Sequence, residues 1–308
     1  MNTQIGTNAL KLNQYVGFKG IIRTILNKSK AVDLVYKVYG PSLTPDTVPI
    51  IVLHGFLGSM RNWQSMCNRI TSHTNRSVIA VDARNHGDSP HADSHNYLDL
   101  AADVSKLITK LAIKKSIIIG HSMGGRTAMV LSLSEPSKIT SQVIADISPV
   151  TTTTGLKDFF PKVLEVMASV DFKGKDLVNA QKEAKNVILK NDLFEHPESV
   201  YFILMNIGRL PNNTYGWKCN VPTLKRDFHH IADFPKDVLS GKTFEGPVLF
   251  IGGSESSFIP PGDITGIKQL FPKAVLRYIP NVGHNVHAED PNAFFNMVVQ
   301  FLADVEKR

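Results

Sequence analysis

The chain has 308 residues, of which 43% are hydrophobic and 20% charged, as in a globular protein long enough to bury a large core. Its two cysteines, Cys67 and Cys219, form neither a CxxC pair nor a Cys/His ligand spacing, which argues against a disulfide framework or a metal site and favours a reducing compartment. No apolar run approaches the ~18 residues of a membrane-spanning helix, so we expect no stable membrane span.

The net charge of +7 is concentrated at the start of the chain. Residues 1–32 contain five basic residues and no acidic one, which leaves the rest nearly neutral and argues against a nucleic-acid-binding surface. An acid-free basic segment with scattered Leu, Ile and Val resembles a mitochondrial targeting segment. We therefore expect a mitochondrial protein, in the matrix. A merely basic arm on a cytoplasmic protein is the alternative.

From residue 32 onward, strand-like and helix-like segments alternate. A helix is predicted between Asn96 and Ile113, and a final helix after Asp290 and Pro291, which read as an N-cap followed by proline in the first turn. Solid apolar runs are typical of strands covered on both faces. The strands expected are 32–39 at an edge, then 50–53, 78–81, 116–119, 143–146, 248–251 and 275–279. This alternation predicts a mostly parallel central sheet with helices on both faces.

One interval interrupts the alternation. Residues 151–245 contain no convincing strand, only helix-like stretches at 156–170, 176–189 and 198–210. We interpret this interval as a helical cap inserted into the core. The expected organisation is a basic targeting-like segment (1–31), the first part of the core (32–150), the cap (151–245) and the second part of the core (246–308).

The sequence GHSMGG at residues 120–125 follows a predicted buried strand and precedes a predicted helix. In that context G-x-S-x-G indicates a nucleophile elbow, in which a sharp turn exposes the serine hydroxyl beside a helix N-terminus. The flanking glycines are expected because side chains two residues from the serine would collide in so tight a turn. Ser122 is therefore the candidate nucleophile.

Two backbone N–H groups are candidates for holding a developing oxyanion. One belongs to Met123, directly after the serine, and the other to Phe56 in the HGFLG segment that follows the strand at 50–53. His54 and His121 are interpreted as buried histidines that fix these loops, without a role in proton transfer.

The candidate base is His284, which follows the last predicted strand and precedes the last helix. A histidine on the final strand-to-helix loop would reach Ser122 if that strand ends beside the elbow. His287 is three residues on and could be mistaken for it. His229 and His230 lie in the predicted cap and are interpreted as surface or packing residues.

Together these motifs resemble those of the α/β-hydrolases, over about residues 32–305. The segments DARNHGDS (82–89), ADISPV (145–150), WKCNVPTL (217–224) and GHNVHAEDP (283–291) narrow the resemblance to the α/β-hydrolase domain-containing protein 11 group and related bacterial short-chain esterases. The resemblance implies an α/β-hydrolase fold and an esterase or lipase acting on acylglycerols or other short to medium acyl esters. It also implies a usual location in mitochondria, where such proteins can associate with a matrix enzyme complex.

The acid of the triad is the unresolved member. Most α/β-hydrolases carry it after the strand before the last, and here Ser256 occupies that position. Serine cannot supply the negative charge that orients the imidazole. Relatives in the resembled group use the aspartate of an ADISPV-like segment, which makes Asp146 the first candidate. Alternatives are Glu255 and the cap acids Asp227 and Asp233. Asp82, Arg84 and Asp88 are interpreted as structural bracing of their loop.

The sequence thus predicts a serine hydrolase of carboxylic esters that needs no metal or organic cofactor, with an acyl-enzyme on Ser122. An alcohol acyltransferase would use the same residues. A binding protein that keeps the fold and guards a mitochondrial enzyme complex is a further alternative, which the intact Ser122 and His284 disfavour.

Overall fold

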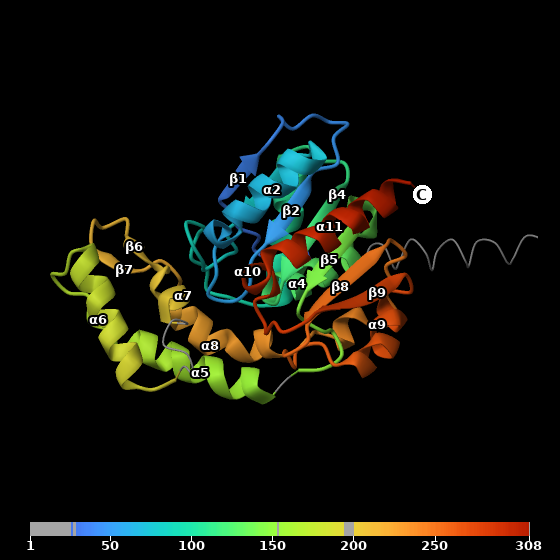
Figure 1. Ribbon diagram of the computed structural model, residues 1–308. Helices are drawn as coiled ribbons and strands as arrows, with labels where there is room; N and C mark the ends of the chain where they lie inside the picture. Colours follow the sequence, from blue (N-terminus) through green and yellow to red (C-terminus); the bar gives the residue numbers. More distant parts are fainter. Residues whose placement is uncertain (1–25, 27–28, 153, 194–199, 308) are drawn as a thin grey trace, which may run out of the picture.

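The computed structural model describes residue 26 and residues 29–152, 154–193 and 200–307. Residues 1–25 and 27–28, most of the predicted targeting segment, lie outside the described residues. The core is a seven-stranded sheet in the order β1-β3-β2-β4-β5-β8-β9 (Figure 1). Its strands are β1 (Tyr36–Tyr39), β2 (Ile50–Leu53), β3 (Val78–Val81), β4 (Ser116–His121), β5 (Ile139–Ala145), β8 (Val248–Gly253) and β9 (Ala274–Ile279). Only β1 is antiparallel to its neighbour, which confirms the mostly parallel sheet.

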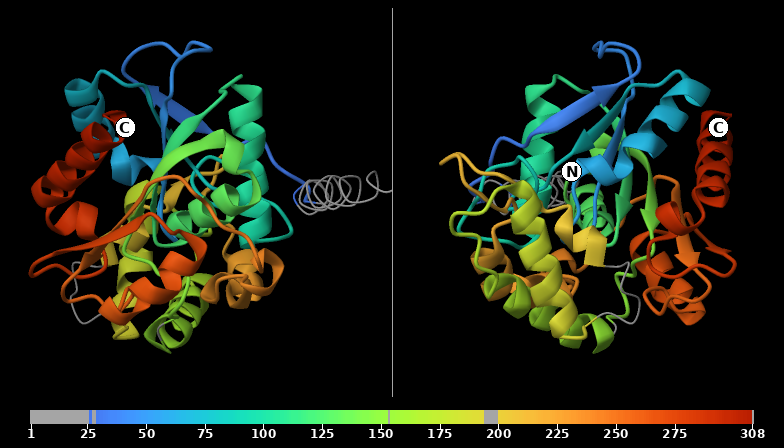
Figure 2. Two further views of the ribbon diagram at one scale, coloured as in Figure 1. Left: turned by 90° about the vertical axis from the view of Figure 1, so that its right-hand side faces the viewer. Right: turned by 60° about the vertical axis from the view of Figure 1, so that its left-hand side comes forward.

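Helices cover both faces of the sheet (Figure 2). Alternate strand residues such as Ile50 and Val52 pack against α2 (Gln64–Thr74) and α11 (Pro291–Glu306). The residue between them, Ile51, faces α3 (Tyr97–Lys110), α4 (Met123–Ser134) and α9 (Ile264–Leu270). This double coverage explains why β2, β3, β4 and β8 are buried along their whole length.

The helices predicted after Asn96 and after Asp290 form, and each begins with a side-chain cap, of which the sequence predicted the one at Asp290. Asp290 accepts hydrogen bonds from the N–H groups of Asn292 and Ala293 at the start of α11. Asn96 accepts one from Asp99 N at 3.0 Å at the start of α3. These side chains satisfy N–H groups that the helices leave without partners in the first turn. A short helix that the sequence did not predict, α10 (Val286–Glu289), directly precedes α11.

Between β5 and β8 the chain leaves the sheet and returns. The described residues of this interval form four α-helices: α5 (Thr154–Ala168), α6 (Leu177–Lys190), α7 (Val200–Leu204) and α8 (Val221–Ala232). In Figure 1 they lie beyond one end of the sheet, and they belong to the interval that the sequence predicted as a cap. The boundaries of the cap at 151 and 245 stay predictions.

The expectation of a strandless cap was wrong. β6 (Ile207–Arg209) and β7 (Tyr215–Trp217) form an antiparallel hairpin. Consequently the helix predicted over 198–210 ends at Leu204, and residues 198 and 199 lie outside the described residues. The turn between the strands contains Pro211 and Asn213, the latter with φ +64°, a conformation that asparagine tolerates better than most residues. Proline stops a helix and the aromatic residues of β7 favour a strand, so the local signal was present but short.

Both crossings between core and cap are tied to helix α4 by one buried arginine. Arg126 is 1% exposed. It donates to the carbonyl oxygen of Ser148 (3.0 and 3.1 Å), before α5, and to that of Ala232 (2.7 Å), at the end of α8. Its position four residues after Ser122 links the cap directly to the elbow helix.

The polar loop after β3 is braced as the sequence suggested. Arg84 pairs with Asp103 at 2.6 Å, and Asp82 accepts from the N–H groups of Met60 and Asp88. These contacts support a structural role for the loop. Within the described part of the chain, no helix is both long and apolar enough to cross a membrane.

Candidate active site

Ser122 lies at the turn between β4 and α4. Its backbone is in a region that most side chains avoid (φ +51°, ψ −117°), as expected of a strained elbow. The glycines around it are sterically required. A Cβ at Gly120 would lie 2.4 Å from the carbonyl oxygen of Gly124, and a Cβ at Gly124 would lie 2.4 Å from that of Leu53. The backbone on either side of Ser122 is therefore fixed by the close approach of β4, β2 and α4.

Asp146 and His284 meet beside this elbow. β5 ends at Ala145, whose carbonyl accepts from Ser122 N at 2.9 Å, and Asp146 follows directly. Oδ2 of Asp146 lies 2.8 Å from Nδ1 of His284, and Oδ1 accepts from Gly253 N at 3.0 Å. Asp146 is fully buried and has φ +47°, a second strained residue at the same edge of the sheet. The structure thus joins Asp146 to His284, and places Asp146 next to the residue that binds the Ser122 backbone, at the carboxyl ends of the parallel strands.

Ser256, at the position where most α/β-hydrolases carry the acid, hydrogen-bonds the carboxylate of Asp146. Its hydroxyl donates to Oδ2 of Asp146, the oxygen that also contacts His284. Its Oγ in turn accepts from Phe258 N at 3.2 Å. The sequence placed Ser256 at the usual position of the triad acid but did not predict this contact. The serine at that position was the only signal for it. The Phe258 ring stacks on His284 with centroids 3.9 Å apart.

The other candidate acids are engaged elsewhere. Glu255 is exposed, and its backbone N–H donates to the carbonyl oxygen of Val282. Asp227 pairs with the adjacent Arg226 and accepts from His95 N at 2.9 Å. Asp233 pairs with Lys157 at 2.9 Å. Asp146 is therefore the candidate that contacts the imidazole.

The neighbouring histidines are held neutral by burial. His121 donates from Nε2 to the carbonyl oxygen of His284 at 2.9 Å. Burial, and then the nearby His284 and His287, keep the pKa of His121 well below its usual range. His287 stacks on Trp63 with centroids 4.1 Å apart, and burial lowers its pKa to about 3. His229 and His230 are exposed in the cap.

The Gly55–Gly58 turn, which we call the oxyanion turn, presents the Phe56 N–H. Gly58 N donates to Gly55 O at 3.0 Å, and Nδ1 of His54 contacts the same oxygen at 2.8 Å. In a trans peptide the N–H points opposite to the C=O, so holding Gly55 O directs the Phe56 N–H the other way. A Cβ added at Gly55 would lie 3.3 Å from Ser122 Cβ, so the turn borders the serine.

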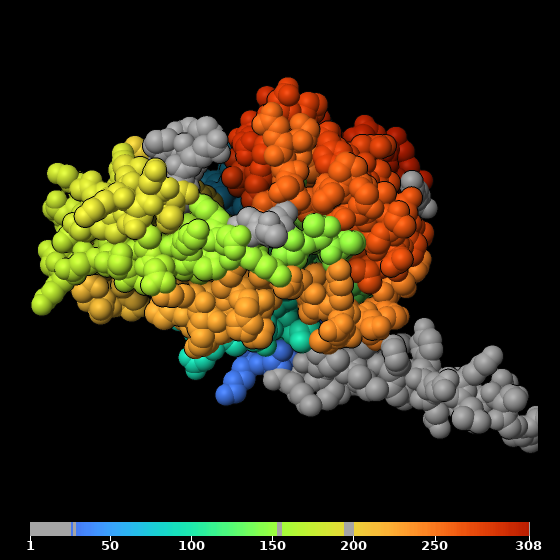
Figure 3. Space-filling view, turned by 90° about the horizontal axis from the view of Figure 1, so that it is seen from below, coloured from blue at the N-terminus to red at the C-terminus, as the bar shows by residue number. Residues whose placement is uncertain are grey.

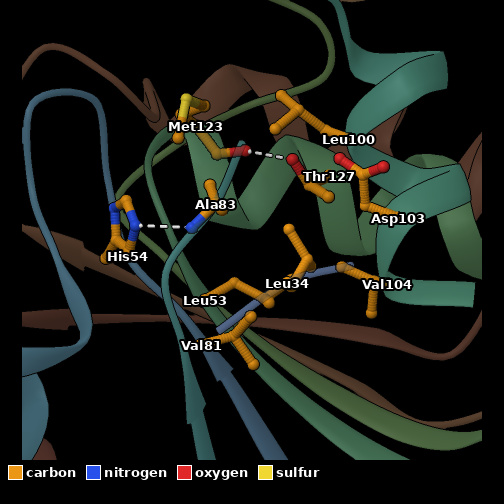
Figure 4. Close-up of a pocket in the computed structure, with 11 residues that line it drawn as sticks. Leu34, Leu53, His54, Val81, Ala83, Leu100, Asp103, Val104, Met123 and Thr127 are labelled. Atoms are coloured by element: carbon orange, nitrogen blue, oxygen red, sulfur yellow. Dashed lines mark hydrogen bonds between the residues drawn. The ribbon is translucent and has the colours of Figure 1, made fainter. Parts of the chain in front are cut away.

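Met123 begins α4, where the first N–H groups of a helix have no partner within the helix. Nε2 of His54 accepts from Ala83 N at 3.0 Å, the bond drawn in Figure 4, which ties the oxyanion turn to the loop after β3. Both histidines that the sequence interpreted as loop-fixing, His54 and His121, make contacts of that kind. The cavity in Figure 4 has a volume of about 10 Å³, room for about one water molecule. It is lined mostly by buried apolar side chains and is too small for a substrate.

A recess opens between the cap and the C-terminal part of the core. In Figure 3 it separates the yellow cap from the red and orange segments, and atoms in the blue of the early chain are visible at its floor. The Phe56 side chain packs edge-on against Phe160 of α5 and Phe228 of α8, with centroids 5.1 and 5.4 Å away. The oxyanion turn therefore packs against aromatic side chains of the cap. Among the described residues, no cluster of three or more His, Cys, Asp or Glu is arranged to hold a metal ion.

Comparisons with known proteins agree with this geometry. The sequence matches the family described as alpha/beta hydrolase fold over residues 48–291. An sn-1-specific diacylglycerol lipase, ABHD11 from Xenopus laevis, is 36% identical over 277 residues, covering 89% of this chain and 85% of the relative. Ethanol acetyltransferase 1 from Wickerhamomyces ciferrii is 28% identical over 298 residues, covering 89% of this chain and 74% of the relative. The solved structure of a marine microorganism esterase has a TM-score of 0.78 at 32% identity, and the match covers 88% of this chain and 100% of that one.

Proposed function

This chain belongs to the α/β-hydrolase family and is a carboxylic ester hydrolase, and from that premise we propose that it works as a serine hydrolase through an acyl-enzyme on Ser122. The observation that carries the proposal is the 2.8 Å contact between Asp146 and His284, made by a fully buried carboxylate beside the strained elbow. A buried carboxylate on Nδ1 holds the ring so that Nε2 is free to take a proton, the arrangement that serine hydrolases use.

The proposed reaction has two halves. In the first, Ser122 Oγ attacks the ester carbonyl carbon while Nε2 of His284 takes the hydroxyl proton. The carbonyl oxygen, now negatively charged, accepts from the N–H groups of Phe56 and Met123. The carbon–oxygen bond to the alcohol then breaks, and His284 returns the proton to the leaving alcohol. In the second half, a water molecule gives a proton to His284 and attacks the acyl carbon. The bond between this carbon and Ser122 Oγ then breaks, His284 returns the proton to Ser122 Oγ, and the acid leaves.

For the substrate we propose an acylglycerol or another short to medium acyl ester. Two things support this class: the aromatic side chains of Phe56, Phe160 and Phe258 around the site, and the diacylglycerol lipase and esterase relatives. Apolar walls stabilise an acyl chain by removing its surface from water.

An alcohol acyltransferase is the second candidate, because the ethanol acetyltransferase relative aligns over 89% of this chain. In that reaction an alcohol takes the place of the water molecule that attacks the acyl-enzyme. The two activities are separated by incubating the enzyme with an ester and increasing concentrations of ethanol, and measuring free acid against ethyl ester.

The proposal is tested by fluorophosphonate labelling and a panel of esters of increasing acyl length. We expect wild-type protein to be labelled at Ser122 and to hydrolyse at least one ester of the panel. The Ser122→Ala variant should do neither while keeping its circular dichroism spectrum. Equal hydrolysis by the two proteins would reject the acyl-enzyme on Ser122.

We also propose a mitochondrial matrix location, supported by the basic, acid-free residues 1–32. Association with a matrix enzyme complex is proposed on family resemblance alone. A reporter fusion described in the Discussion tests the location.

A further inference from the structure

The oxyanion turn contains a residue that needs external support. Leu57 has φ +57°, in the left-handed region that costs free energy for a residue with a side chain, and it is only 1% exposed. A glycine would adopt this conformation without strain. Because the turn nevertheless carries leucine, its conformation depends on the groups that bind the Leu57 backbone.

The core supplies the first of these groups. Nε2 of His86 accepts from Leu57 N at 3.1 Å, and Nδ1 of the same ring contacts the carbonyl oxygen of Arg84 at 3.0 Å. A carbonyl oxygen cannot donate, so Nδ1 carries the proton and Nε2 is the acceptor. His86 is completely buried, and burial keeps its pKa well below the usual range, so the ring stays in this neutral form.

The cap supplies the second group. Nδ2 of Asn206, between α7 and β6, donates to the carbonyl oxygen of Leu57 at 2.8 Å, across a separation of 149 residues. The same nitrogen lies 3.3 Å from Ile203 O, so both neighbours are carbonyl oxygens and the amide must present its NH2 group. The Asn206 backbone is itself fixed, because its N–H donates to Ile203 O and its carbonyl accepts from Lys218 N.

We propose that Asn206 is a positioning residue through which the cap holds the oxyanion turn, so that the Phe56 N–H is correctly aimed only while the cap is docked. The inference rests on the proposed function. The N–H of Leu57 is hydrogen-bonded to the core, and its C=O is hydrogen-bonded to the cap. The Phe56 side chain is held between the cap residues Phe160 and Phe228. The oxyanion turn thus has contacts from both halves of the molecule, and the aim of the Phe56 N–H depends on both.

The test compares Asn206→Leu with Asn220→Leu in the full-length protein. Leucine at position 206 keeps the approximate size of the side chain and removes the donor to Leu57. Asn220 is the matched control, because its Nδ2 also joins the cap to the core, to Asn85 Oδ1 at 3.1 Å, without contacting the oxyanion turn. Asn206→Ser is a second variant, since its hydroxyl is too short to reach Leu57 O but adds no bulk.

Four quantities are measured for each variant: kcat and KM on one ester, the inhibition constant of a trifluoromethyl ketone, and the thermal midpoint. The ketone forms a tetrahedral oxyanion adduct with a serine and therefore reports on the oxyanion hole, which KM does not. Loss of a whole oxyanion donor costs about 10²–10³ in kcat. For a misdirected donor we expect kcat of both Asn206 variants to fall about 10- to 50-fold. The inhibition constant should rise by a similar factor, with KM within about threefold.

The outcomes separate the inference from the proposed function. If wild type is active and Ser122→Ala is not, but the Asn206 variants keep wild-type kcat and inhibitor affinity, the positioning role is wrong and the serine hydrolase stands. An equal loss in Asn220→Leu would also overturn the inference, because the effect would then not depend on the hydrogen bond between Asn206 and Leu57. If wild type neither hydrolyses esters nor reacts with fluorophosphonate, the proposed function fails and the positioning role falls with it.

Discussion

The hydroxyl of Ser256 and Nδ1 of His284 converge on the same carboxylate oxygen, Oδ2 of Asp146. Asp146 follows β5 and Ser256 follows β8, and these two strands are adjacent in the sheet. A carboxylate from the neighbouring strand therefore reaches the place where an acid at position 256 would lie. The serine remaining at that position donates to the carboxylate and steadies it.

Removing this hydroxyl should weaken catalysis without abolishing it. We expect Ser256→Ala to lower kcat about 10- to 150-fold, the scale of one hydrogen bond to a charged group. Ser256→Thr keeps a hydroxyl and is the matched control, expected to retain most of the activity. Steady-state kinetics on a single ester decides. A loss in Ser256→Ala as large as that of Asp146→Asn would mean that the serine does more than support the carboxylate.

Replacing the acid should have the larger effect. Asp146→Asn removes the charge that stabilises the imidazolium, and we expect kcat to fall at least ~10³-fold, the range seen when a triad aspartate becomes asparagine. Glu255→Gln should cost less than ~10-fold, because Glu255 is exposed to solvent that screens its charge. Both variants are measured on the same short-chain ester after circular dichroism confirms folding. The reverse ranking would make Glu255 the acid, and full activity in both would move the acid to the cap.

Loss of the candidate nucleophile should be nearly complete. In Ser122→Ala the oxyanion donors and binding surfaces remain, so only residual catalysis of that origin is expected. Alanine removes one oxygen from a tight elbow, so the thermal midpoint should change by only a few degrees. Hydrolysis is followed together with fluorophosphonate labelling, and labelling of the alanine variant would point to another nucleophile.

Acid should destabilise the fold through its buried histidines. Burial holds the pKa of His95 and His287 at about 3, against an ordinary value of 6.5. Between these values the unfolded chain binds protons that the native state excludes, so stability falls as the pH drops through this window. Each such histidine contributes a slope of about 1.4 kcal/mol per pH unit.

His287→Phe is the variant that isolates one of these contributions. Phenylalanine keeps an aromatic ring on Trp63 and removes a buried Nδ1 that has no hydrogen-bond partner among the described residues. The unfolding free energy is measured by urea titration at pH 7, 6 and 5. Its decrease per pH unit should be smaller in the variant by about the contribution of one histidine. An unchanged slope would show that His287 is protonated in the native state.

The location is tested with a fusion of residues 1–35 to a fluorescent reporter. We expect the fusion to enter mitochondria, because its first 32 residues are basic and free of acidic residues. A matched fusion with the five basic residues of 1–32 changed to glutamine should stay outside. Diffuse cytosolic fluorescence of the unchanged fusion would leave the cytoplasmic alternative.

The sequence predicted the parts of the molecule that depend on neighbours along the chain. The core strands, the elbow and the loop of His284 each have a local signature of apolar runs and glycines. The acid was harder to choose, because the choice depends on β5 lying beside β8, which no local pattern reports. The hairpin β6–β7 was missed because two three-residue strands resemble ordinary loop sequence. The contact between Asn206 and Leu57 joins residues 149 apart and belongs to no motif, so only the folded chain reveals it.

The hydrogen bonds of Arg126 limit the positions at which the cap could move away from the core. Its guanidinium donates hydrogen bonds to carbonyl oxygens in both segments that connect cap and core, at Ser148 and at Ala232. Separating either crossing from α4 would leave a buried cation with unfilled donors, which is costly. The segment before α5 and the end of α8 are therefore fixed to the helix that follows Ser122, and a movement of the cap that keeps these bonds would leave both of them in place.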